Sequence, residues 1–283
     1  PHLAAGALHP RDGHVVVGRR LVPQPGDDRR FLHQIVRVFI YGAFAVAITT
    51  WSYQLVAGAL GLTNIGPVTP RAASWGVELG YALLSFALQD LVGYAIHYGQ
   101  HRIPILWAFH KVHHSAEVLT PLTRYREHVL EGPLYSSAAA VGYAVPAAVF
   151  AWLFAGSIKQ MMLWNIGVFA LLFGFNGAFR HYHVQFRYPR WLEKWLQSPA
   201  MHHTHHSYLP QHWDTNMAVV TSIWDRMFGT LYIPAKDEYT PWGLGPEQQH
   251  ECRSFAQNVA APFRDWHRML TRRPDTQPDA HSL

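Results

Sequence analysis

The chain has 283 residues, of which 49% are hydrophobic and only 14% are charged, and its formal net charge is +5. So little charge beside 14% aromatic residues is unusual for a soluble domain, whereas a mean hydropathy near zero excludes a chain that lies wholly in lipid. The single cysteine, Cys252, excludes an internal disulfide and a cysteine-based zinc or iron–sulfur site. No basic stripe or nucleic-acid motif is present, so the positive charge indicates a membrane surface.

Residues 1–32 are polar and rich in Pro and Gly, and we expect them to form an irregular arm. Four apolar segments that are long enough to cross a bilayer follow, at 35–62, 75–96, 134–154 and 161–179. The second contains Glu78 and Asp90, and acids inside a membrane tend to face protein, water or a functional site. The alternative is a soluble all-helical protein with buried hydrophobic helices.

Basic residues flank the four segments unevenly. They gather before the first segment and after the second and fourth, whereas the opposite connections carry only Arg71 and Lys159. The positive-inside tendency therefore places both termini and every histidine cluster on the cytoplasmic side. The predicted fold is all-α: an integral membrane protein with four transmembrane helices and a cytoplasmic helical cap that holds a histidine-rich dimetal site.

The predicted organisation has three parts. Residues 33–245 form a single membrane-embedded catalytic domain, in which 97–131 and 180–245 make the cap, and the polar arm precedes it. Residues 246–283 are expected to form an amphipathic helix and a disordered tail. Phe255, Val259, Phe263, Trp266 and Leu270 have helical spacing there, which suits either a helix at the membrane interface or one packed on the cap.

Twelve of the 20 histidines lie between residues 97 and 206, most of them in regular groups. His97 and His101 are four residues apart, and the pattern H-x-x-H-H occurs twice, at 110–114 and 202–206. Spacings of three and four place side chains on one face of a helix about one turn apart. Neutral imidazoles that converge from several helices make a metal site, and imidazole suits iron, zinc, copper or nickel.

The number of histidines predicts two metal ions. The three motifs contain eight imidazoles, which is more than one ion binds. We therefore expect two ions, with a ninth ligand from His181 or His183. His203 lies off the helical pattern and is interpreted as a bystander, while His128 and His212 could line the site or simply pack. Asp90 lies on the helix face of His97 and could accept a ring N–H, and Glu127, Asp214 and Asp225 are further acids near the clusters.

Several motifs resemble the fatty acid hydroxylase/sterol desaturase superfamily. They are DLVGYAIHYGQH at 90–101, WAFHKVHHS at 107–115, REHVLE at 126–131, FRH at 179–181, SPAMHHTHHS at 198–207 and WDRMFGT at 224–230. Their order agrees with the superfamily over residues 75–245. Two departures concern His183, where the family often has Asn, and Asn216-Met217-Ala218, where it often has Asn-Tyr-Gly.

The resemblance implies an integral-membrane, non-haem di-iron oxygenase that hydroxylates a C–H bond of a lipid or other hydrophobic substrate. It implies two iron ions, O2 as co-substrate, and electrons from a separate donor protein of ferredoxin or cytochrome b5 type. Four further residues are candidates for an extra metal ligand or for a hydrogen bond to a metal-bound ring: Asp90, His128, His183 and Asp225. The iron ligands that it implies are His97, His101, His110, His113, His114, His181, His202, His205 and His206.

Other activities are compatible with the same residues. Desaturation shares its first step with hydroxylation, so the same scaffold could serve a desaturase. A zinc-dependent membrane hydrolase, with zinc or another divalent metal at these histidines, is the strongest competitor from another class. A non-catalytic metal- or haem-binding membrane protein is the third reading.

Overall fold

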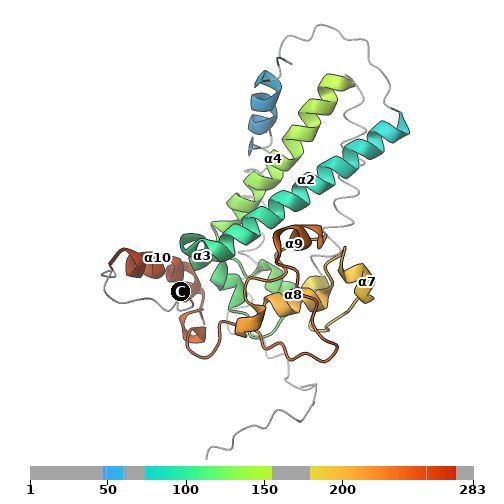
Figure 1. The fold of residues 1–283 in the computed structure, drawn as a ribbon. Coiled ribbons are helices and arrows are strands. Elements are labelled where there is room, and N and C mark those ends of the chain that lie inside the picture. The colour runs from blue at the N-terminus through green and yellow to red at the C-terminus, as the bar shows by residue number, and fades with distance from the viewer. Residues whose placement is uncertain are drawn as a thin grey trace, which may run out of the picture.

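The computed structural model describes residues 47–48, 50–59, 61, 74–154, 179–252 and 254–271. Within these ranges the fold is helical and contains no strand, only two isolated bridges, so the all-α prediction is confirmed for the described residues. Figure 1 shows two long helices packed along each other and a compact group of short helices and loops at one of their ends.

The two long helices are α2 (Trp75–Arg102) and α4 (Glu131–Leu153). Both are long and apolar enough to cross a membrane, over Trp75–Arg102 and Glu131–Phe150, and they correspond to the segments predicted at 75–96 and 134–154. Residues 50–59 of the segment predicted at 35–62 are helical, and the rest of it lies mostly outside the described residues, as does nearly all of 161–179. A four-helix membrane domain therefore remains a prediction.

Helix α2 is longer than the hydrocarbon core of a bilayer is thick. Its 28 residues span roughly 42 Å at the α-helical rise, against about 30 Å for a hydrocarbon core. Ser74 caps its first turn through its side-chain oxygen, and Pro104 begins the next helix, which separates α2 from α3 (Pro104–His114). The last turns of α2, which carry His97 and His101, therefore reach the cap.

Helix α4 approaches α2 closely at Gly142. A Cβ atom at this position would lie 2.9 Å from Cγ of Gln89, so a larger residue would push the helices apart. The first residue of α4, Glu131, is fully buried under the cap. The close packing of the two helices thus sets the place of Glu131 relative to the end of α2.

The cap is built from short elements. In chain order they are α3, η2 (Pro121–Tyr125), α7 (Arg190–Glu193), α8 (Pro199–His205), η4 (Pro210–His212), α9 (Ile223–Phe228), η5 (Gln249–Cys252) and α10 (Phe255–Thr271). Helix α8 has Pro199 in its first turn and Ser198 as a side-chain cap, and α9 ends at Gly229, whose φ of 76° favours glycine. Helix α10 lies on α3.

Candidate metal centre

The cap brings nine histidines together in two adjacent groups. The five-histidine group contains His97, His101, His110, His114 and His205, and the four-histidine group contains His113, His181, His202 and His206. Within each group, one ring nitrogen from every histidine lies within 4.8 Å of all the others. These are the nine residues that the resemblance implies as ligands, and the division into five and four is a finding of the structure.

Each H-x-x-H-H motif contributes to both groups. On α3, His110 and His114 join the five-histidine group, whereas His113 joins the other. On α8 and its C-cap, His202 and His206 join the four-histidine group, whereas His205 crosses over. The first and last histidines of each motif are four residues apart and share a helix face. The histidine between them points about 100° away from the last one, so it can join the other group. The rings of His114 and His206, one from each group, stack with centroids 4.5 Å apart.

Hydrogen bonds orient the rings of the five-histidine group from behind. The Nδ1 atom of His97 lies 2.7 Å from the carbonyl oxygen of Met217, and that of His205 lies 2.8 Å from the carbonyl oxygen of Thr215. The Nδ1 atom of His110 lies 2.8 Å from Oε1 of Glu131. These acceptors require Nδ1 to carry the proton, so Nε2 of the same rings offers its lone pair to the interior of the group.

The four-histidine group places its Nε2 atoms against one another. Nε2 of His181 lies 2.9 Å from that of His202 and 3.3 Å from that of His206, and the last two atoms are 3.1 Å apart. A neutral imidazole nitrogen carries either one hydrogen or one lone pair in the plane of its ring. Three such atoms that face one another cannot all be paired, whereas a cation between them would accept every lone pair.

Burial keeps these imidazoles neutral. It lowers the pKa of His110 to about 3, and it lowers the pKa of five further clustered histidines on α3, α8 and its C-cap well below the usual value, helped by the neighbouring imidazoles. The latter are His113, His114, His202, His205 and His206. Neutral rings with converging lone pairs are the form that binds transition metals, so the donor set fits two ions such as iron or zinc.

Asp90 holds a loop rather than a histidine ring. Its carboxylate accepts hydrogen bonds from the backbone N–H groups of Val220 and Thr221 and from the side chains of Thr221 and Trp224. The expectation that it accepts a ring N–H is therefore wrong for the described residues. Asp90 does lie on the predicted face of α2. However, the segment Val220–Trp224 lies beside that part of the helix and supplies four hydrogen-bond donors.

Asp225 acts through the peptide that orients His97. Its carboxylate accepts hydrogen bonds from the N–H groups of Met217 and Ala218, at 2.8 and 3.1 Å, and from the hydroxyl of Thr230. The carbonyl of the same Met217 faces His97. Asp225 is thus connected to the five-histidine group, as expected. The connection runs through the peptide between Met217 and Ala218, not through a direct hydrogen bond to a histidine ring.

Two candidates for an extra ligand lie outside both groups. His183 is exposed beside Tyr182, and His128 packs against Phe109 with ring centroids 4.8 Å apart. The Nδ1 atom of His128 accepts from the N–H of Leu130, and its Nε2 lies 3.4 Å from the carbonyl oxygen of Val259 on α10. The side chain of His183 points outward after His181, and of the two alternatives left open for His128 its contacts favour packing, because it serves the contact with α10.

The remaining candidates are placed as follows. His203 is buried against Trp242 and belongs to neither group, as expected of a bystander. His212 lies 2.8 Å from the carboxylate of Glu238 and does not line the groups. Asp214 lies 3.7 Å from Nδ1 of His101 and also pairs with Arg102, so this acid does stand behind a clustered histidine.

Sequence reasoning missed the role of Glu131. Besides facing His110, its carboxylate accepts from the side chain of Gln100 at 2.8 Å and from the N–H of His128 at 2.9 Å. Gln100 in turn accepts from the hydroxyl of Tyr135 at 2.6 Å. The available signal was an acid within the REHVLE motif directly before an apolar segment, where an unpaired charge would be costly.

A family model described as fatty acid hydroxylase matches residues 82–230, which include all nine clustered histidines. The chain belongs to the fatty acid hydroxylase family. The match begins within α2 and ends just after α9, so it covers the metal centre together with Asp90, Glu131 and Asp225.

Two kinds of curated relatives of this family member are informative. Alkylglycerol monooxygenase from Danio rerio is 32% identical over 157 residues, which are 55% of this chain and 31% of that protein, and the Homo sapiens protein is 29% identical over 180 residues, 63% and 33%. Ornithine lipid hydroxylase OlsE from Rhizobium tropici is 26% identical over 196 residues, which are 66% of this chain and 50% of that protein. The chain thus aligns with a third to a half of each relative's length. No solved structure matches it.

Proposed function

We propose that this family member is a membrane-bound monooxygenase that uses O2 and external electrons to hydroxylate a C–H bond of a lipid. The observation that carries the proposal is the convergence of nine histidines in two adjacent groups at the end of two long apolar helices. In this proposal each group holds one iron ion, and the nine histidines are its ligands. Hydroxylation is preferred to desaturation and hydrolysis because the named relatives are a monooxygenase and a lipid hydroxylase.

Bound iron would supply the activation of O2, with two electrons from a separate donor protein of ferredoxin or cytochrome b5 type. The chain would supply orientation: Met217, Thr215 and Glu131 accept the Nδ1 protons of three rings and so direct their Nε2 atoms into the five-histidine group. It would also exclude water, because eight of the nine histidines are buried.

The site lies where a lipid could present a C–H bond from the bilayer. His97 and His101 belong to the last two turns of α2, whose preceding turns carry exposed leucines such as Leu79 and Leu83. A substrate that stays partly in the membrane would therefore reach the histidines along α2. We propose that this end of α2, with both chain termini, faces the cytoplasm, and that 33–245 acts as one catalytic domain.

Metal analysis and lipid mass spectrometry test the proposal on the same protein. The purified chain should contain about two iron ions, and host lipids should gain one oxygen atom when the chain is expressed. The variant His113→Ala should lose the O2-dependent product, because His113 is the only member of the four-histidine group on α3. His183→Ala, an exposed histidine two residues from His181, is the matched control and should keep full turnover.

Each contrary outcome has a separate meaning. Fewer than about one metal ion per chain, with unchanged turnover in His113→Ala, would refute the dimetal centre. Loss of two hydrogens from the lipid would indicate a desaturase. Activity without O2 or reductant would indicate a zinc-dependent hydrolase.

A further inference from the structure

Helix α10 carries an apolar stripe that its packing covers only in part. The rings of Phe263 and Trp266 contact Phe109 of α3, whereas other parts of the stripe stay exposed. Phe255, Val259, Phe263, Trp266 and Leu270 fall within an arc of about 80° on a helical projection. Three of them are strongly exposed: Phe255 at 52%, Phe263 at 48% and Leu270 at 85%. An amphipathic helix that folds onto a soluble core would instead turn this stripe inward.

Most of the buried face of α10 is elsewhere on the helix, although Pro262, at the edge of the stripe, is also buried. Ala261 and Asp265 are buried, and they lie about 120° or more around the helix from the centre of the stripe. Asp265 pairs with the buried Lys111 of α3 at 2.5 Å, and Lys111 also pairs with Glu251 at 2.7 Å. This ion cluster holds α10 on α3, the helix that carries three of the clustered histidines.

The exposed stripe runs between the cap ends of the two long helices. Trp266 donates its Nε1 hydrogen to the carbonyl of Ile105, which follows the end of α2, and Ile105 is itself 51% exposed. At the other side, the carbonyl of Val259 faces His128, shortly before α4. Leu130, next to the start of α4, is also exposed. The stripe therefore continues the apolar surface at the ends of both candidate membrane spans.

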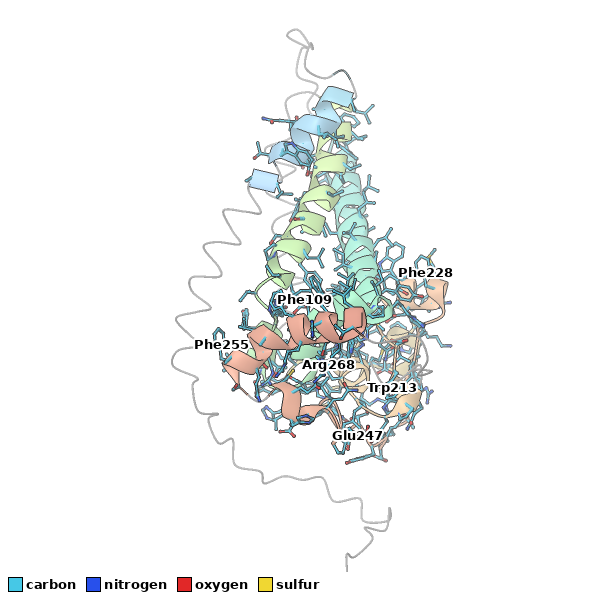
Figure 2. All side chains as sticks on the ribbon, turned by 90° about the vertical axis from the view of Figure 1, so that its left-hand side faces the viewer. Phe109, Trp213, Phe228, Glu247, Phe255 and Arg268 are labelled. Atoms are coloured by element: carbon cyan, nitrogen blue, oxygen red, sulfur yellow. The ribbon has the colours of Figure 1, made fainter. Side chains whose placement is uncertain are left out.

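Charge and orientation agree with this position. The exposed side chains of Arg264 and His267 lie on the polar side of α10, where anionic headgroups would favour them. Arg268 lies on the same side and pairs with Glu251 and Asp265. Figure 2 shows α10 lying crosswise to α2 and α4, at the ends of these helices that meet the cap. A helix that crosses the spans at their end lies in the plane of the membrane surface if the spans cross the bilayer.

We propose that α10 lies in the headgroup layer of an anionic bilayer, with Phe255, Phe263 and Leu270 inserted among the upper acyl-chain segments. The proposal rests on α2 and α4 crossing the membrane. Because Lys111 joins α10 to α3, the depth of α10 in the membrane sets the depth of the histidine groups. Helix α10 is thus a membrane-docking element that positions the metal centre relative to the acyl chains.

Fluorescence quenching from the lipid tests the orientation of α10. The full chain is reconstituted in phosphatidylcholine–phosphatidylglycerol vesicles, and a polarity-insensitive fluorophore is attached at Leu270→Cys or, on the polar side, at Ala260→Cys. Cys252 is buried, and the unsubstituted chain serves as the labelling blank. Nitroxide placed high on the acyl chain should quench the label at 270 at least about threefold more strongly than the label at 260.

The controls separate this proposal from its premises. A label at Leu83→Cys, an exposed position on α2, reports whether α2 crosses the bilayer. Strong lipid quenching at 83 with equal quenching at 260 and 270 would overturn the docking of α10 alone, and no quenching at 83 would overturn the premise and the docking together. Protection at 270 from both lipid nitroxide and aqueous iodide, with self-quenching, would assign the stripe to a second copy of the chain and overturn the proposal. Iron content and turnover of the same samples report on the proposed enzyme activity separately.

Discussion

The two histidine groups differ in the hydrogen-bond acceptors that face the Nδ1 atoms of their rings. In the five-histidine group, Met217, Thr215 and Glu131 accept the Nδ1 protons of three histidines, and Asp214 lies near a fourth. In the four-histidine group, the Nδ1 atoms of His113, His202 and His206 are buried without a hydrogen-bond partner among the described residues. Most rings of the five-histidine group are therefore oriented by the protein before a metal binds, whereas these three rings of the other group depend on ring packing and on the metal itself.

Histidines from the same two motifs thus enter groups of unequal chemistry. A ring whose Nδ1 proton is fixed cannot rotate or change tautomer without losing a hydrogen bond. A ring held only by its neighbours can do both. We expect the five-histidine group to bind its ion more tightly, and the four-histidine group to be the one whose ligands rearrange.

Removing the carboxylate behind His110 should have the largest effect in this comparison. Glu131→Gln replaces an acceptor of three hydrogen bonds by an amide that must offer N–H to at least one donor. We expect turnover and metal affinity to fall about 10- to 100-fold, as for other groups behind metal-bound histidines. Turnover assays and chelator competition measure both. Glu117→Gln makes the same change at an exposed site and should leave both unchanged; a normal metal affinity in Glu131→Gln would contradict the comparison.

Chelator titration should remove the two ions in separate steps. The four-histidine group, in which three Nδ1 atoms have no acceptor among the described residues, should release its ion first. We expect it to do so at least about tenfold more easily, because such acceptors contribute that much to affinity. Metal content followed during titration gives the two steps. In the variant Glu131→Gln, the chelator concentration that removes the tighter ion should fall toward the concentration that removes the weaker ion, and the latter should not change. Loss of both ions in a single step from the unsubstituted chain would remove the basis for ranking the groups.

Asp225 should affect the five-histidine group more mildly, because it acts through a peptide. Asp225→Asn keeps the size of the side chain but turns an N–H group toward the donors of Met217, Ala218 or Thr230. We expect a loss of about 1–3 kcal/mol in the free energy of unfolding and a several-fold loss of turnover. Denaturation in detergent and a lipid hydroxylation assay test this. The exposed Asp237→Asn is the control, and a stability equal to that of the control would exclude this role.

His128→Ala should give the smallest effect on the metal centre. The ring packs on Phe109 and faces the carbonyl of Val259, so its loss should weaken the contact with α10 by about 1–2 kcal/mol. Metal content should stay at the value of the unsubstituted chain. A lost ion in this variant would mean that His128 reaches the metal after all, and elemental analysis decides the matter.

Part of the structure could be predicted from particular residues. Spacings of three and four selected eight of the nine clustered histidines, all but His181, and separated His203 from them, because these spacings describe one face of a helix regardless of the fold. The apolar segments at 75–96 and 134–154 predicted α2 and α4 for a similar reason, since a helix that crosses lipid needs an uninterrupted run. Helix α2 continues six residues beyond Ile96, as expected from the helical spacing of Asp90, His97 and His101.

Contacts between distant segments could not be predicted. Asp90 was expected behind a histidine and instead binds a loop 130 residues later in the chain, and Glu131 was not considered although it faces His110. Hydrogen-bond partners of this kind depend on which loop lies beside a helix, and helical periodicity contains no information on that. His183 was kept as a possible ligand because spacing alone does not give the direction of the chain after His181.

The sequence by itself determined the chemistry that is available: neutral imidazoles at helical spacing, no thiol ligands, and apolar helices next to them. Only the tertiary structure decided how these imidazoles are shared, because His113 and His205 leave the partners of their own motifs and join the opposite group. Neighbouring residues on a helix point about 100° apart, and which of two directions meets a second helix is decided by the packing of α2, α3 and α8.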